Sequence, residues 1–278
     1  MLRISTEEWQ EIERMGPGVR EYKGKNTLFW NGEELWEYSY SYRGRVLVHS
    51  KDERDSWQVI IVMPGVEEIR ENSFVRCLNI EAVIMADSIT WVGHCAFENC
   101  KSLVFIKLSR NLISIGQHAF QFCESLTSIF IPPSCTEIID FAFASCAKLR
   151  ILSIPQHTQL WLGVFYGAAF TTKSPFEINN GYYSLDSNDP DREQAEIVPW
   201  IRSINNEEKY TLHRLCCSHV LEMNDIQTFV EREGLLAMTV RNSIGVTPSE
   251  YLEANPYLKV KEKQIIKDFI LRKMGELV

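Results

Sequence analysis

The strongest constraint on this chain is a unit of 23 residues that repeats four times in succession. Phenylalanine recurs at that step, and cysteine, alanine and several aliphatic residues recur in phase with it. The shared pattern is I-x-x-x-A-F-x-x-C-x-x-L-x-x-I-x-I-P. One such unit cannot bury its apolar face by itself, whereas stacked units share a continuous core. The phenylalanine column is Phe74, Phe97, Phe120 and Phe143.

Two copies carry the pattern best, "IGQHAFQFCESLTSIFIP" (115–132) and "IIDFAFASCAKLRILSIP" (138–155). These residues resemble the BspA-like leucine-rich repeat family, in which A-F-x-x-C precedes L-x-x-I-x-I-P. The resemblance covers residues 57–170 and implies a short β-solenoid. In the strand part of a unit, alternate side chains point inward, as Ile129 and Ile131 should, while Ser128 and Phe130 point outward.

The cysteine column is Cys77, Cys100, Cys123 and Cys146. We expect a ladder of buried, reduced packing thiols. Neighbouring strands are close enough for disulfides, but side chains in one column point the same way. A zinc site would need paired ligands such as C-x-x-C, which the sequence lacks, so no metal is expected. The N-terminus carries no secretory pattern, which also favours thiols.

The predicted fold class is an α+β repeat protein in four parts. Residues 1–56 form a cap with a helix, a hairpin at Asn31-Gly32 and a short helix from Ser50. Residues 57–172 form the solenoid, and 173–208 a polar linker with a helical segment near 197–204. Residues 209–278 form a helical module.

The helical module resembles a degenerate pair of ankyrin units, whose signature is T-P-L-H-x-A. Thr211-Leu212-His213 lacks the proline, and Thr247-Pro248-Ser249 lacks the leucine and histidine. The resemblance implies a structural role for His213 in tying a turn. The last segment, 259–277, is amphipathic with a basic face. We expect a cap helix, with a helix for an acidic partner or an anionic membrane as the alternative.

No catalytic motif, phosphate loop or dinucleotide fingerprint occurs in the sequence, so neither an enzyme nor a cofactor is expected. The net charge of −8 disfavours nucleic acid as a partner. Cys95 and His118 should be neighbours on adjacent coils, which leaves a thiol-dependent enzyme as a remote alternative. Asp87 and Arg110 share a column and are expected to pair.

The outward strand positions are unusually apolar for a sheet that faces solvent. Such a face is either a partner surface or is covered by the chain itself. We therefore expect a non-enzymatic interaction scaffold for a protein partner, in the cytoplasm or nucleus, with a surface or adhesion protein as the alternative. No apolar run is long enough for a membrane helix. The predicted binding residues are Ile84, Phe105, Lys107, Phe130 and Ile151.

Overall fold

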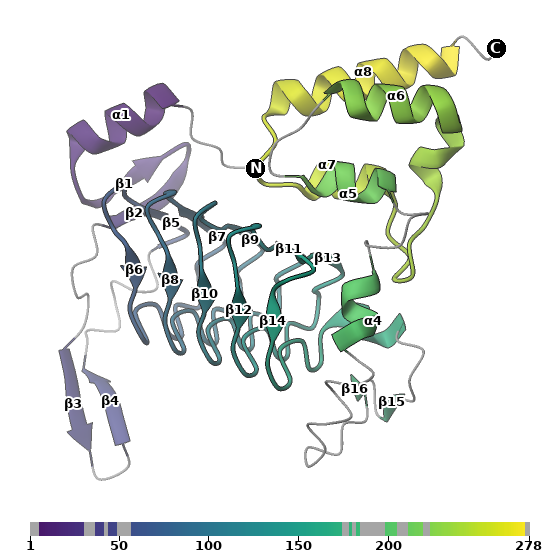
Figure 1. Cartoon of the computed structure of the whole chain (residues 1–278). Coiled ribbons are helices and arrows are strands. Elements are labelled where there is room, and N and C mark those ends of the chain that lie inside the picture. Colours follow the sequence, from purple (N-terminus) through teal and green to yellow (C-terminus); the bar gives the residue numbers. More distant parts are fainter. Residues whose placement is uncertain are drawn as a thin grey trace.

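The computed structural model shows a solenoid of stacked coils with a helix and a hairpin at one end (Figure 1). A group of helices lies beside its C-terminal half. The β-solenoid with helical flanks that the sequence predicts is confirmed. The structure describes residues 6–30, 37–41, 44–48, 57–173, 178–179, 182–183, 198–204, 211–218 and 223–275.

Each coil contributes a longer and a shorter strand, and strands of successive coils pair in parallel. The longer strands are β5 (Val59–Val62), β7 (Ala82–Met85), β9 (Phe105–Lys107), β11 (Ser128–Phe130) and β13 (Ile151–Ser153). The shorter strands are β6 (Glu68–Ile69), β8 (Trp91–Val92), β10 (Ser114–Ile115), β12 (Glu137–Ile138) and β14 (Gln159–Leu160).

The pairing register follows the sequence repeat. Val59 pairs with Ala82 and Ala82 with Phe105, each a step of 23. In the last coil Glu137 pairs with Gln159, a step of 22. The final coil is therefore one residue shorter, which explains why Phe165 falls one position early in the repeat.

The two stacks of strands differ in continuity. The shorter strands form one sheet in the order β14-β12-β10-β8-β6. The longer strands form two pieces, β5-β7-β9, which two N-terminal strands, β1 (Gly18–Tyr22) and β2 (Lys25–Trp30), extend, and β11-β13. Within the described residues, strand pairing is thus interrupted between β9 and β11.

The core of the solenoid is a column of aromatic rings and aliphatic side chains. Each phenylalanine of the repeat stacks on the next, with ring centroids 5.1 Å apart from Phe74 through Phe143. Phe165 continues the column at 5.5 Å despite its earlier position in the sequence. Inward residues of the longer strands, such as Ile106 and Ile129, pack against this column and are buried. The repeat thus defines one continuous core.

The N-terminal end of the solenoid is closed by α1 (Thr6–Met15) and the hairpin of β1 (Gly18–Tyr22) and β2 (Lys25–Trp30). Strand β2 pairs with β5 on its other side, so the hairpin extends the sheet. The predicted turn at Asn31-Gly32 and the short helix from Ser50 lie outside the described residues. Strand β2 forms an antiparallel hairpin with β1, and the two strands are joined by a turn at Lys23 and Gly24.

Short elements follow at both flanks. Strands β3 (Glu37–Ser41) and β4 (Gly44–Val48) pair with each other, as do β15 (Ile178–Asn179) and β16 (Tyr182–Tyr183). The 3₁₀ helix η1 (Ala169–Lys173) and helix α4 (Val198–Ser203) follow the last coil. From α4, the Arg202 guanidinium donates a hydrogen bond to Thr158 O at 2.9 Å.

The C-terminal helices are α5 (Thr211–Cys217), α6 (Met223–Glu233), η4 (Leu235–Thr239), α7 (Pro248–Ala254) and α8 (Val260–Gly275). Figure 1 shows α5 and α7 next to the solenoid and α6 and α8 farther out. Thr247 begins α7 with a capping box in which Glu250 takes part. Buried His213 donates a hydrogen bond from Nε2 to Val246 O at 3.0 Å, a structural contact as predicted. The ankyrin-like character of these helices stays a prediction.

Candidate protein-interaction surface

The outward side chains of the longer strands form what we call the strand face. All five predicted binding residues lie on it, but the chain covers three of them. Ile84 is buried by the N-terminal end, in an apolar cluster that contains Ile12 of α1, Phe29 of β2 and Ile61 of β5. Ile84 is therefore not available to a partner in this structure.

The C-terminal helices cover the other end of the strand face, and we call residues 211–218 and 223–275 the C-terminal cover. Phe130 and Ile151 are buried beneath it. The Tyr251 ring meets the Phe130 ring edge-on, with the ring centroids 6.2 Å apart. The sequence left open whether this apolar face is a partner surface or is covered by the chain itself. At Phe130 and Ile151 it is covered by the chain.

Two tyrosine hydroxyls anchor the cover to the solenoid backbone. Tyr251 Oη donates a hydrogen bond to Leu152 O at 2.9 Å. Tyr257 Oη lies 3.2 Å from Leu108 O and 3.3 Å from Phe130 O, so its proton is shared between two carbonyls. These contacts join residues about 100 to 150 positions apart in the sequence. Nothing in the repeat pattern could have indicated them.

We call α1 and the β1-β2 hairpin the N-terminal cover. Phe105 and Lys107 of β9 lie between the two covers, and Phe105 packs against the apolar cluster of the N-terminal cover. Both side chains are half-buried, and Ile106 between them is buried in the core. Ser128 of the neighbouring strand β11 is likewise partly exposed. The strand face therefore reaches solvent in a window around β9, of which Phe105 is the large apolar side chain.

Beside this window, Arg110 of the solenoid contacts both Asp87 and a tyrosine of the C-terminal cover. Its backbone N–H donates to Asp87 Oδ1 at 3.0 Å, and its guanidinium lies 3.6 Å from Asp87 Oδ2. The predicted pairing of Asp87 with Arg110 is thus confirmed. The same guanidinium lies 5.8 Å from the centre of the Tyr257 ring, within the range of a cation–π contact.

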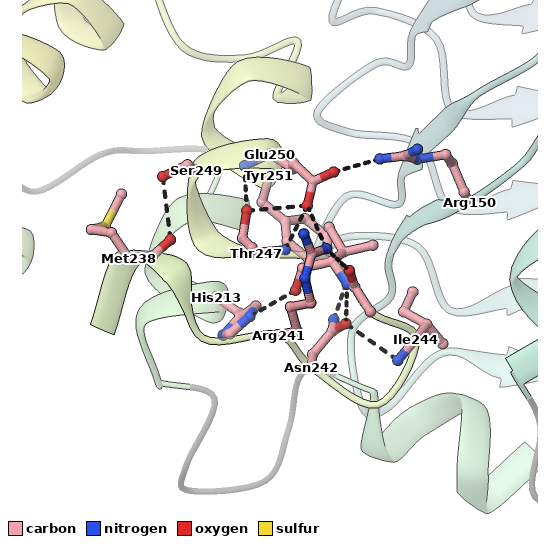
Figure 2. A network of polar contacts seen from close by, with 12 residues as sticks. Arg150, His213, Met238, Arg241, Asn242, Ile244, Thr247, Ser249, Glu250 and Tyr251 are labelled. Atoms are coloured by element: carbon pink, nitrogen blue, oxygen red, sulfur yellow. Dashed lines mark hydrogen bonds and ion pairs between the residues drawn. The ribbon is translucent and has the colours of Figure 1, made fainter. Parts of the chain in front are cut away.

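A cavity of about 500 Å³ opens where the last coil meets the C-terminal cover. Arg150 and Phe170 line it from the solenoid, and Arg241 and Glu250 line it from the cover. Figure 2 shows Glu250 between the two arginines, at 2.5 Å from Arg150 and 3.6 Å from Arg241. Because both guanidinium groups are more than half exposed, these ion pairs add little stability.

Several groups act on the Glu250 carboxyl. Burial raises its pKa, but hydrogen bonds from the Thr247 backbone and hydroxyl, followed by the charges of Arg150 and Arg241, lower it below the ordinary value overall. Glu250 therefore carries its negative charge at neutral pH and holds the junction as an anion. Both arginines of this cavity share Glu250 as their partner, so two positive charges face one negative charge and the lining keeps a net charge of about +1.

Cys95 and His118, the remote enzyme hypothesis, occupy the turns of adjacent coils in left-handed backbone conformation. The Cys95 sulfur lies 3.2 Å from His94 Nε2. Burial, followed by the charges of Glu98 and Glu71, raises the pKa of the Cys95 thiol to about 12. A nucleophilic cysteine needs the opposite shift, because the thiolate is the reactive form.

The four cysteines of the repeat column are free thiols without solvent exposure. The sulfur of Cys123 lies 3.3 Å from Phe97 O of the preceding coil, and those of Cys100 and Cys146 make the same contact one coil away. Burial raises the pKa of all three of these thiols. Each thiol thus donates a weak hydrogen bond across the coil boundary.

The described part of the chain shows neither a metal-binding cluster nor a membrane-spanning helix. No group of three or more histidine, cysteine, aspartate or glutamate side chains there could hold a metal ion. None of the helices there is long and apolar enough to cross a membrane.

Residues 58–182 match the family model described as a BspA type leucine rich repeat region, in six copies. This segment is a BspA-type leucine-rich repeat region. The resemblance that the A-F-x-x-C columns indicate is therefore confirmed for the repeats, while the division of the chain into four parts stays a prediction. No curated protein matches the chain significantly.

Solved bacterial leucine-rich repeat structures are similar to part of the repeat protein. A leucine rich repeat protein of T. pallidum is 23% identical over 49% of this chain and 66% of its own, with a TM-score of 0.40. A leucine rich cell surface protein from Faecalibacterium prausnitzii is 30% identical over 46% of this chain and 34% of its own (TM-score 0.38). A protein from Bacteroides ovatus is 29% identical over 53% and 39% (TM-score 0.39). The chain thus spans about one third to two thirds of their lengths.

Proposed function

We propose that the leucine-rich repeat protein is a non-enzymatic interaction scaffold that binds a protein partner through the window of the strand face around β9. The observation that carries this proposal is the partial exposure of Phe105 and Lys107 between two covers that bury the rest of the predicted site. An aromatic side chain held on a paired strand offers apolar contact area with little entropy to lose, which is typical of residues that dominate binding.

The state of Cys95 supports a scaffold over the thiol-dependent enzyme. With its pKa at about 12, the buried thiol stays protonated at neutral pH. The C-terminal cover is a second candidate surface of the same scaffold, as the ankyrin-like resemblance implies.

The experiment is a pull-down from the native cell lysate with wild type, Phe105→Asp and Val104→Asp, read by mass spectrometry. Val104 is also exposed but precedes β9, so Val104→Asp is a matched control for an added carboxylate. We expect Phe105→Asp to lose proteins that wild type and Val104→Asp retain, with unchanged circular dichroism in all three. Identical sets of captured proteins would contradict binding at the window.

A surface or adhesion protein remains the alternative function, and the cellular location decides between the two. Protease treatment of intact cells should leave a cytoplasmic or nuclear scaffold uncut, whereas a surface protein would be digested.

A further inference from the structure

The C-terminal cover is held together by its own contacts. Helix α5 packs on α7, and α6 packs on η4. The Asn255 side-chain amide donates to Cys216 O and to Ser218 O, both at 2.9 Å. Asn242 Oδ1 accepts hydrogen bonds from the backbone of Ile244 and Val246. None of these bonds involves the solenoid, so they can persist if the cover moves away.

The contacts between the cover and the solenoid are of another kind. Within the described residues the cover adds no strand to either sheet. Its polar contacts with the strand face include the hydroxyls of Tyr251 and Tyr257 and the exposed pair of Glu250 with Arg150. Exposed ion pairs contribute little, and a neutral hydrogen bond contributes modestly. The junction therefore depends mainly on apolar contact, in which Phe130 and Ile151 belong to one continuous cluster with buried side chains of the cover.

Tyr257 also marks where the junction begins. Its hydroxyl contacts the carbonyls of Leu108 and Phe130, which directly follow β9 and end β11. Pairing of the longer strands is interrupted between these same two strands. The edge of the cover thus coincides with a break in the sheet, while the shorter strands and the phenylalanine column continue past it.

We propose that the C-terminal cover lifts from the strand face as a folded unit, and that this opening exposes Phe130 and Ile151 to the partner. The first part concerns the chain itself, and the second part rests on the proposed function. The cover is then an intramolecular ligand of the strand face, and a partner competes with it for the β11 and β13 end.

Native cysteines of the full chain can report the opening through their rates of alkylation. The Cys217 thiol hydrogen-bonds to Ser153 of β13, so lifting the cover exposes it. Cys216 lies on a different face of α5, which it shares with Leu212 one turn earlier, and should stay buried inside a lifted cover. Cys123 in the solenoid core reports unfolding of the repeats.

We expect alkylation of the wild type without denaturant to modify Cys217 first, with Cys216 and Cys123 much slower. Tyr257→Phe removes the shared hydroxyl and keeps the ring, and should accelerate Cys217 by about fivefold without changing Cys123. Tyr22→Phe is the matched control, because it removes a hydroxyl that contacts Glu8 at the opposite end of the chain. This control should leave the Cys217 rate unchanged.

Two results would overturn the lifting cover. If Cys217 and Cys123 react at one rate with the same dependence on urea, the cover and solenoid are a single cooperative unit. If Cys216 and Cys217 react together ahead of Cys123, the cover unravels instead of lifting.

The partner pull-down tests the second part separately. Tyr257→Phe should raise by about fivefold the capture of those proteins that Phe105→Asp loses. Unchanged capture with accelerated Cys217 labelling would show that the cover opens but does not control binding. If Phe105→Asp loses no protein, the scaffold proposal fails while the labelling result for the cover stands.

Discussion

Replacing Cys123 by serine and by alanine measures what the cysteine column contributes. Cys123 is fully buried, and its sulfur faces the Phe97 carbonyl at 3.3 Å. Burying a hydroxyl without a partner costs roughly 1–3 kcal/mol. Here the serine hydroxyl finds an acceptor, and that hydrogen bond returns about 0.5–1.5 kcal/mol. We therefore expect Cys123→Ser to lower the free energy of unfolding by about 1 kcal/mol.

The alanine variant separates the hydrogen bond from the packing. Cys123→Ala removes the sulfur and leaves a small cavity, for which we expect a loss of about 1–2 kcal/mol. The Phe97 carbonyl keeps the hydrogen bond from the Cys100 backbone and is not left unpaired. Urea unfolding followed by circular dichroism measures both variants. A loss above about 3 kcal/mol for serine, together with less than about 1 kcal/mol for alanine, would refute the cross-coil hydrogen bond.

Three further predictions follow from buried groups. Burial raises the thiol pKa of Cys100 and Cys123 well above its ordinary value, so both thiols stay protonated in the folded chain, whereas those of the unfolded chain ionise above about pH 8.5. The free energy of unfolding should therefore fall as the pH rises above about 8.5, and it should fall less steeply in Cys123→Ser. Urea midpoints measured at several pH values would show this. Gly116→Ala should cost about 1–3 kcal/mol in urea unfolding, because its Cβ would lie 2.7 Å from the Gly93 carbonyl carbon; an unchanged midpoint would contradict this close approach. Phe130→Asp should expose Cys217 to alkylation with the solenoid still folded, whereas Phe105→Asp should not, and equal rates in the two variants would contradict the difference in their burial.

The solenoid could be predicted from the sequence because every coil repeats the same residue types at the same step. The inward residues, such as Phe97 and Cys100, differ chemically from their sequence neighbours. Only one alignment of successive coils places each of these residues on its counterpart in the next coil. The last coil departs from this step by one residue, which places Phe165 one position early in the pattern.

The sequence does not indicate whether the strand face is exposed or covered by the chain itself. A face that binds a partner and a face that the chain covers both need outward apolar residues. Phe130 and Ile151 are covered through Tyr251 and Tyr257, which lie outside the repeats and follow no period. The hairpin of β1 and β2 was not predicted either, because the pairing of β2 with both β1 and β5 depends on the whole sheet.

The regular step of the coils makes the distance between the two covers adjustable. A 23-residue coil inserted between β7 and β9 would preserve every column of the core and move the covers apart by one strand spacing, about 4.8 Å. Each insertion would lengthen the accessible stretch of sheet by one more strand, with its own pair of outward side chains. Repeat number in such a chain therefore sets the length of the strand face that stays accessible to solvent.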